Sequence, residues 1–170
     1  MGHAVQHTIL FATRRDTKAK TILLSLALCF LSAAVCFAQD AFTGTWKLNE
    51  AKSKLSSGAP KNSTVVYEAA GENVKVTIDG TDRDGKPTHD QWTGKFDGKD
   101  YPVTSDPNED MRSLTKIDDH TLGFNVKKNG KVTTSGRIAV SADGKSRTVT
   151  TSGTEAQGKK FKSTAVYDKQ

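Results

Sequence analysis

The chain has 170 residues, with 25 Lys and Arg against 19 Asp and Glu, and 35% of its residues are hydrophobic. Positive and negative residues are interspersed, and the densest basic spots, Lys127-Lys128 and Lys159-Lys160, lie beside turns. Nucleic-acid binding would require a basic stripe or a clustered basic face, so we expect no nucleic-acid partner.

Residues 1–38 are predicted to be a signal peptide. A basic region at 14–20 is followed by an uncharged run, rich in Leu and Ala, from Thr21 to Ala38. Cys36-Phe37-Ala38 places small residues where a signal peptidase reads, so we expect cleavage before Gln39 and a secreted or periplasmic protein. Two alternatives stay open: a retained anchor, because the run approaches the length of a membrane span, and lipidation at Cys36.

Cleavage would leave residues 39–170, the size of one domain. Both cysteines, Cys29 and Cys36, lie in the leader, so the domain has no disulfide and must be held by a hydrophobic core. The leader takes four basic residues and one acidic residue from the totals, which leaves 21 basic and 18 acidic residues and a net charge of +3. We expect a monomer with no stable membrane insertion after cleavage.

Short strands separated by turn dipeptides make up the rest of the chain. Asp-Gly and Asn-Gly pairs recur from Asp79-Gly80 onwards, and such pairs supply the positive φ angles of tight hairpin turns. Between them lie runs rich in Val, Thr, Ile, Tyr and Phe. These patterns predict ten strands, at residues 42–48, 63–70, 73–79, 88–96, 99–104, 111–117, 121–128, 131–141, 146–152 and 160–168.

Alternation along these runs predicts antiparallel sheet with one apolar face. Val74, Val76 and Ile78 share a face, for example, and no segment shows a sustained helical period. Sequential hairpins favour an all-β fold, an antiparallel up-and-down β-barrel, over a two-sheet sandwich, because closure removes exposed edges. The longer connections are 49–62, with room for one helical turn, and 105–110, a polar turn around Pro107.

Both ends of this domain carry a family resemblance. Phe42-x-Gly44-x-Trp46-Lys47-Leu48 resembles the opening strand of the calycins, which include the lipocalins and the intracellular fatty-acid-binding proteins. Val166-Tyr167-Asp168-Lys169 is similar to the last strand of the fatty-acid-binding branch. The resemblance implies a barrel that can hold one small ligand. Gly44 and Trp46 are expected to close one end of it, with another backbone close to the Trp46 ring.

The sequence departs from the fatty-acid-binding branch at three points. That branch commonly has an Arg two residues before the terminal Tyr, which helps to hold the ligand carboxylate, whereas this chain has Ala165. The face of Tyr167 therefore carries Ala165 and Ser163 and no cation on its own strand. Segment 49–62 is too short for the helical lid of that branch, and the branch is cytosolic whereas this chain is expected to be exported. We expect Tyr, Ser and Thr hydroxyls to orient a ligand.

Catalytic and metal-binding signals are weak. Outside the leader the chain has no Cys, and its histidines, His89 and His120, are expected to face solvent. Asp106-x-Asn108-x-Asp110 matches the start of a calcium loop, but Met111 stands where a glycine is needed and the closing Glu is missing. We expect ordinary Asx turns there. The prediction is a protein without cofactor or metal that is not an enzyme.

Four aromatic residues with a polar tip are the predicted lining of a ligand pocket: Tyr67, Trp92, Tyr101 and Tyr167. The predicted function is non-covalent binding of a small apolar or amphipathic ligand inside the barrel. The alternative is a solid barrel that acts as a protein-interaction or inhibitor module through loops 49–62 and 105–110. A cavity of roughly 300 Å³ or more would favour the carrier, and a filled core the interaction module.

Overall fold

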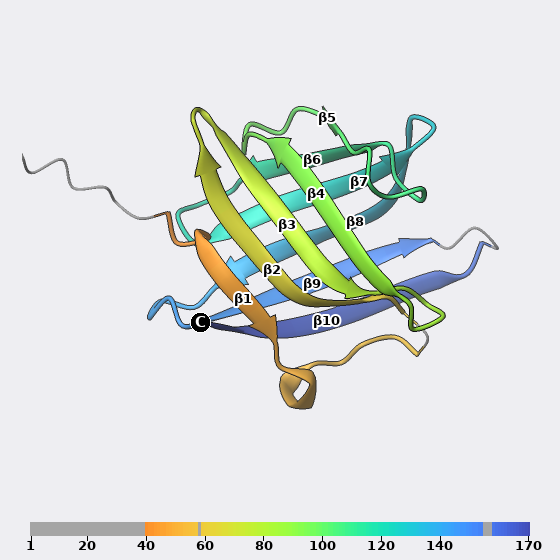
Figure 1. Ribbon diagram of the computed structural model, residues 1–170, viewed down its shortest axis with the longest axis horizontal. Helices are drawn as coiled ribbons and strands as arrows, with labels where there is room; N and C mark the ends of the chain where they lie inside the picture. The colour runs from red at the N-terminus through yellow and green to blue at the C-terminus, as the bar shows by residue number, and fades with distance from the viewer. Residues whose placement is uncertain (1–39, 58, 155–157) are drawn as a thin grey trace, which may run out of the picture. The chain divides into compact units, whose positions relative to one another are not determined.

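The computed structural model describes residues 40–57, 59–154 and 158–170, so the predicted leader and its cleavage site lie outside the described residues. Ten strands and one short 3₁₀-helix, η1, make up the described part of the chain (Figure 1). The elements are β1 (Gly44–Leu48), η1 (Glu50–Lys52), β2 (Lys61–Ala70), β3 (Asn73–Thr81), β4 (Pro87–Gly94), β5 (Tyr101–Pro102), β6 (Met111–Lys116), β7 (Thr121–Lys128), β8 (Lys131–Val140), β9 (Ser146–Thr154) and β10 (Lys160–Lys169).

All ten strands belong to one antiparallel sheet with the order β4-β3-β2-β1-β10-β9-β8-β7-β6-β5. Each strand is hydrogen-bonded to the strand that follows it in the chain, with the exception of β4 and β5, which are linked only by the isolated bridge between Trp92 and Val103. In addition, the first strand, β1, pairs with the last, β10. This is a nearly closed up-and-down barrel. The predicted architecture is confirmed, and the sandwich alternative is wrong.

Only β7 has both of its predicted bounds; the other strands begin and end within two residues of the predicted ones, and the differences at β5 and β1 have structural causes. β5 has only two residues, not the six expected at 99–104, because Pro102 has no backbone N–H and the chain turns away, with Val103 N donating to Asp110 O at 2.9 Å. β1 begins at Gly44 rather than at residue 42. Phe42 precedes the strand in a turn and is nevertheless 1% exposed.

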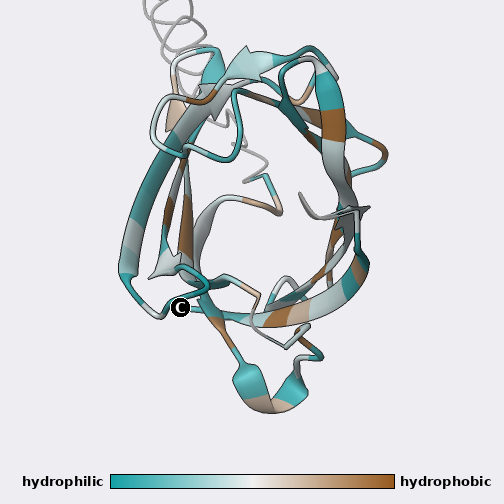
Figure 2. Ribbon diagram, turned by 90° about the vertical axis from the view of Figure 1, so that its right-hand side faces the viewer, coloured by the Kyte–Doolittle hydropathy of each residue, from teal (hydrophilic) through white to brown (hydrophobic). Residues whose placement is uncertain are grey.

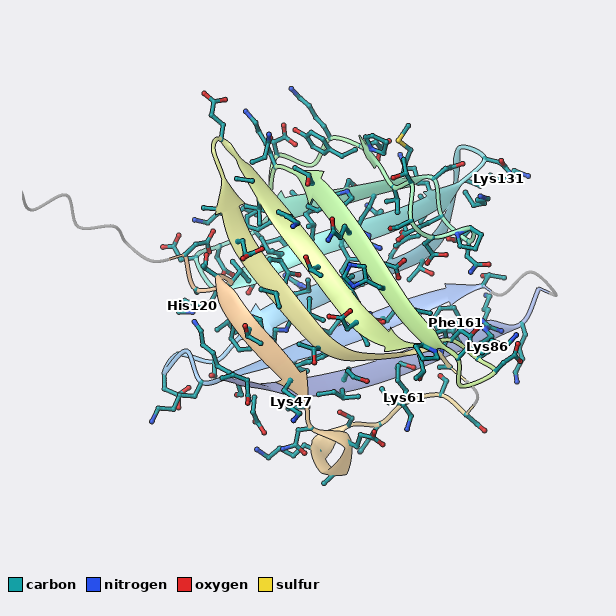
Figure 3. The ribbon with its side chains drawn as sticks, in the orientation of Figure 1. Lys47, Lys61, Lys86, His120, Lys131 and Phe161 are labelled. Atoms are coloured by element: carbon teal, nitrogen blue, oxygen red, sulfur yellow. The ribbon has the colours of Figure 1, made fainter. Side chains whose placement is uncertain are left out.

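The barrel has two distinct ends, because in an up-and-down sheet every second connection lies on the same side. The N-terminal end, where β1 begins, carries the β6–β7 and β8–β9 turns, and Val140 N donates to His120 O across them at 2.8 Å. The loop end carries segment 49–62, the β5–β6 connection and the β7–β8 turn. Figure 3 shows His120 at the N-terminal end, with Lys131 and Phe161 toward the loop end.

Side chains at the N-terminal end fill the barrel. Trp46 and Leu122 are fully buried, and Phe42 packs edge-on against Phe96 with ring centroids 5.8 Å apart. Figure 2 looks along the barrel and shows apolar and polar residues alternating along the strands, the pattern expected when one face of each strand points inward. The buried rings of Phe42 and Trp46 therefore close this end of the barrel.

Residues 49–56 lie along β10 and form a short strap. The predicted single helical turn is present as η1. Asn49 Nδ2 donates to Asp168 Oδ2 at 2.6 Å, Lys54 pairs with Thr164, and Ser56 N donates to Ser163 Oγ at 3.0 Å. None of the helices in the described part of the chain has the length and apolar character needed to cross a membrane.

Candidate functional site

A cavity of about 220 Å³ lies inside the barrel. It is smaller than the roughly 300 Å³ of typical small-molecule pockets, but the interior is not filled by side chains. Strands β2, β3 and β6–β10 line it. The lining residues are Asn62, Val65, Tyr67, Val76, Ile78, Arg112, Leu114, Phe124, Val126, Thr134, Ile138, Arg147, Val149, Thr151 and Tyr167.

Two of the four predicted lining residues meet in this cavity. Tyr67 on β2 is 5% exposed and Tyr167 on β10 is 4% exposed. Among the described residues we find no hydrogen bond from either phenol. Burial raises the pKa of Tyr167 to about 12, with the Arg147 charge opposing the shift and Tyr67 adding to it. The Tyr167 phenol is therefore neutral at physiological pH and keeps its proton for donation.

The other two predicted residues lie away from the cavity and pack on each other. Trp92 and Tyr101 form an edge-to-face pair with centroids 5.9 Å apart. The Tyr101 hydroxyl donates to Asp97 Oδ2 at 3.1 Å, and Trp92 is 2% exposed. These side chains lie near the β4–β5 junction, where the sheet is held by few backbone bonds.

The residue that distinguishes the cavity is Arg147, on β9. It is 2% exposed, and neither Nε nor Nη1 has a hydrogen-bond partner among the described residues. Its guanidinium carbon lies 5.1 Å from the Trp46 ring centroid, 5.2 Å from that of Tyr67 and 4.5 Å from that of Tyr167. The cation is thus surrounded by three aromatic rings and has no counter-ion in the described part of the chain.

An unpaired buried cation is expensive to maintain. Removing an ion from water costs several kcal/mol even after relaxation, and a desolvated cation–π contact returns about 2 kcal/mol or more. The ring faces lower the cost of burying Arg147, but they do not accept its N–H hydrogen bonds. An anionic group in the cavity would accept those bonds, and charge-assisted hydrogen bonds to guanidinium are among the stronger ones in proteins.

Arg147 was missed because the sequence reasoning looked for a cation only on the last strand. The β9–β10 register places Arg147 directly opposite Tyr167, so the neighbouring strand supplies the charge where Ala165 does not. One signal was available. Arg147 and Val149 alternate onto the same face of the predicted 146–152 strand, and an apolar neighbour two residues on indicates an inward direction.

A second arginine lines the opposite end of the cavity and is paired. Arg112, at the start of β6, donates from Nε to Glu109 Oε2 at 3.3 Å and from Nη2 to Glu109 Oε1. The Glu109 side chain is 3% exposed and that of Arg112 is 15% exposed. Burial raises the pKa of Glu109; the charge of Arg112 lowers it, and Asp106 and Asp90 raise it further. The sequence predicted a polar turn at 105–110. The structure shows that one of its residues, Glu109, is buried.

Gly44 and Trp46 lie at the N-terminal end, where the barrel is filled. Trp46 Nε1 donates to Phe42 O at 2.8 Å. Gly44 has φ +117°, and a Cβ built there would lie 3.1 Å from Cε of Lys169, whose Nζ is 5.1 Å from the Trp46 ring centroid. A Cβ at Gly44 would thus meet the Lys169 side chain, and the backbone group that contacts the Trp46 ring is the Phe42 carbonyl.

The remaining polar motifs carry no site in the described part of the chain. Asp106 Oδ1 accepts from Asn108 N at 2.7 Å, an Asx turn as predicted, and His89 and His120 are exposed. No group of three or more potential metal ligands occurs among the described residues. A hollow of about 310 Å³ on the outer surface of β8–β10 is lined by Ser, Thr and Gly with Arg137 and Lys162; it lacks a buried, unpartnered group.

Comparison with known proteins agrees with the barrel geometry. The chain resembles a Schistosoma mansoni fatty-acid-binding protein solved in complex with arachidonic acid, at 19% identity over 76% of this chain and 96% of that one, with a TM-score of 0.52. The fold is calycin-like. Lobster apocrustacyanin A1 (11% identity, 78% of this chain and 63% of that one, TM-score 0.41) and a redesigned β-barrel (14%, 80% and 97%, 0.41) overlap less well. At such identities the likeness of this calycin-like chain to solved structures establishes the fold alone.

No family model matches the chain, and no curated protein matches it. The predicted resemblance is therefore confirmed at the level of the fold, and the chemistry must be argued from the cavity itself.

Proposed function

We propose that the protein binds a small amphipathic molecule non-covalently inside the barrel, with an anionic group at Arg147. The observation that carries this proposal is a buried guanidinium that lines an internal cavity, is 2% exposed and has no counter-ion in the part of the chain that the structure describes. A buried charge without a partner is the costliest arrangement in a protein interior. A bound anion removes that cost, so Arg147 favours anions over neutral ligands.

The residues around Arg147 suit a carboxylate or a similar oxyanion. Tyr167 lies opposite Arg147 on the adjacent strand, and Tyr67 stacks on the same guanidinium. Both phenols can donate hydrogen bonds to an oxyanion held by the guanidinium. Hydroxyl groups were expected to orient a ligand on their own; we now propose that they assist a cation.

The rest of the cavity suits a short apolar chain. Most of the remaining lining residues are aliphatic or aromatic, among them Val76, Leu114 and Ile138, and Asn62, Thr134 and Thr151 are the polar ones. The volume of about 220 Å³ corresponds to about seven water molecules at roughly 30 Å³ each. A ligand with a short hydrocarbon chain fits this space better than a long-chain lipid. If the protein is exported as predicted, it would bind and release this ligand in the periplasm or the medium.

The cavity is smaller than the roughly 300 Å³ that would favour a carrier by volume alone, but the two loops of the alternative interaction module are packed against the barrel. Residues 49–56 are hydrogen-bonded along β10, and Glu109 of the 105–110 connection is buried. Both loops therefore support the barrel instead of standing free as contact surfaces. A binding role also requires no catalytic groups, and the sequence gives only weak signals for such groups.

The test replaces Arg147 by Met, which keeps the length of the side chain and removes its charge. We expect the affinity for octanoate, measured by displacement of a fluorescent fatty acid and by native mass spectrometry, to fall at least about tenfold, because a hydrogen bond to a charged group contributes about 1.5–3 kcal/mol. The melting temperature should not fall, since the variant no longer buries a cation.

The matched control is Arg137→Met, on the outer face of β8, where the side chain is exposed. This variant should bind octanoate as the unmodified chain does. Equal octanoate affinity for Arg147→Met and Arg137→Met would refute the proposal. So would an Arg147→Met variant that binds normally but melts much earlier, because Arg147 would then be a structural plug held by its three rings.

A further inference from the structure

The cavity has an arginine at each end, and the two differ in their partners. Arg147 is the second residue of β9, directly after the β8–β9 turn at the N-terminal end. Arg112 is the second residue of β6, directly after the 103–110 connection at the loop end. Both line the same cavity. Only one of them is neutralised within the described residues, and the neutralising carboxylate comes from Glu109.

The position of Glu109 is fixed by its backbone as well as by its ion pair. Its N–H donates to Asp106 O at 3.4 Å, and the next residue, Asp110, donates from N to Lys127 O at 2.9 Å. These bonds hold the connection against the start of β6 and the end of β7. The carboxylate is 3% exposed and makes two hydrogen bonds to one guanidinium, so its placement over Arg112 is well determined.

We propose that Glu109 is a specificity-determining residue of the cavity: by neutralising Arg112 it restricts the ligands to those with one anionic end, held at Arg147, and an apolar far end. This inference rests on the proposed function. Without Glu109 the cavity would present a cation at each end of an apolar channel, which is the recognition pattern of an α,ω-dicarboxylate or another chain with two acidic ends.

The surroundings of Glu109 reinforce the discrimination. Asp90 on β4 and Asp106 on the connection both act electrostatically on Glu109 and on each other, and Arg112 is the cation that opposes them. A second ligand carboxylate at this end would meet three acidic groups and one cation. It would lose its hydration without gaining a free donor, and an unpaired buried charge costs several kcal/mol. A methyl end would meet no such penalty.

The pKa of Glu109 supports the same arrangement. Burial is the largest influence and raises it; Arg112 opposes that shift, while Asp106 and Asp90 add to it. The pKa of Asp90 is also raised, mainly by burial, and Ser105 and His89 are among the groups that oppose this shift. Glu109 is thus held in its charged form less firmly than an ordinary carboxylate, and acidification should make the unmodified chain behave like a variant without this charge.

The experiment compares two ligands on three proteins, each prepared as the full chain. The ligands are octanoate and octanedioate, which differ by one added carboxylate. The proteins are the unmodified chain, Glu109→Gln, and the double variant Glu109→Gln/Arg112→Gln, in which the second cation is removed as well. Affinities are measured by displacement of a fluorescent fatty acid and checked by native mass spectrometry.

For Glu109→Gln we expect octanedioate affinity to rise at least about tenfold, which is about 1.4 kcal/mol, while octanoate affinity changes by less than about twofold. The double variant should lose the gain, because Arg112 supplies it. An octanedioate affinity that does not rise in Glu109→Gln, or that rises equally in the double variant, would overturn the proposal.

A second measurement covers the case in which Glu109→Gln does not fold. Octanesulfonate and α,ω-octanedisulfonate stay ionised in acid, so their relative affinity for the unmodified chain can be followed as pH falls. We expect the disulfonate to gain on the monosulfonate as Glu109 takes up a proton; a constant ratio contradicts the inference. If octanoate and octanesulfonate fail to bind any protein, the proposed function itself fails; if they bind through Arg147 without this gain, only the role of Glu109 is wrong.

Discussion

The two arginines that line the cavity differ in what compensates their charge. At the loop end Arg112 receives a carboxylate from the protein, and the pair is locally neutral. At the N-terminal end Arg147 receives three ring faces and no counter-ion among the described residues. A charge that the protein neutralises itself contributes to structure, whereas one left without an anion is available to a ligand.

This comparison also shows which end can give way. The N-terminal end is filled by Trp46, Phe42 and Leu122, each at most 1% exposed. The loop end depends on a two-residue β5 and on the isolated bridge between Trp92 and Val103. If the proposed ligand enters the barrel, we expect it to do so at the loop end, because fewer packed side chains and backbone hydrogen bonds must separate there.

The largest expected effect comes from removing the ring on which Arg147 rests. Trp46→Ala should lower the free energy of unfolding by about 3–5 kcal/mol, because it leaves a cavity under a buried cation and breaks the bond from Nε1 to Phe42 O. Urea titration monitored by circular dichroism measures the loss. Trp46→Phe, which keeps a ring face and loses only the indole, should cost clearly less. Equal costs for the two variants would show that the ring face is not what supports Arg147.

The sequence predicted the barrel well because the relevant information is local. Asp-Gly and Asn-Gly turns and the alternation of apolar residues determine ten antiparallel strands regardless of what the barrel contains. β5 was overestimated because the effect of Pro102 on pairing depends on whether the strand has a partner on that side. Tyr67 and Tyr167 line the cavity, whereas Trp92 and Tyr101 pack edge-to-face on each other near the β4–β5 junction; whether any of the four binds a ligand stays a prediction.

The arginines could not be assigned in the same way. Whether Arg147 faces a ligand depends on its register opposite Tyr167 and on the lack of a carboxylate nearby, and both are properties of strand pairing. Glu109 lies in a connection whose composition suggests a polar turn, three residues before Arg112 at the start of β6. Only the fold shows that Glu109 is buried and pairs with Arg112, which lines the cavity, so the distribution of charge between the two ends is information that the linear pattern does not contain.

A smaller effect concerns the pH dependence of stability. The pKa of Glu109 is raised in the folded protein, so the folded state binds this proton more tightly than the unfolded state does. Its contribution to stability is then fully present below the unfolded pKa and is lost as pH rises through the folded pKa. Unfolding titrations of the unmodified chain and Glu109→Gln across this range should diverge, with the unmodified chain losing stability relative to the variant as pH rises. A difference that does not change with pH contradicts the shift.

The smallest effect separates the cation from the phenol beside it. Tyr167→Phe removes one hydroxyl and keeps the ring that lies 4.5 Å from the Arg147 guanidinium. Octanoate affinity should fall by about twofold to tenfold, since a hydrogen bond from an uncharged donor contributes about 0.5–1.5 kcal/mol, and stability should hardly change because this hydroxyl has no partner among the described residues. If Tyr167→Phe weakens octanoate as much as Arg147→Met does, the phenol and not the guanidinium holds the anion. An unchanged affinity would place the anion on the far side of the guanidinium, away from β10.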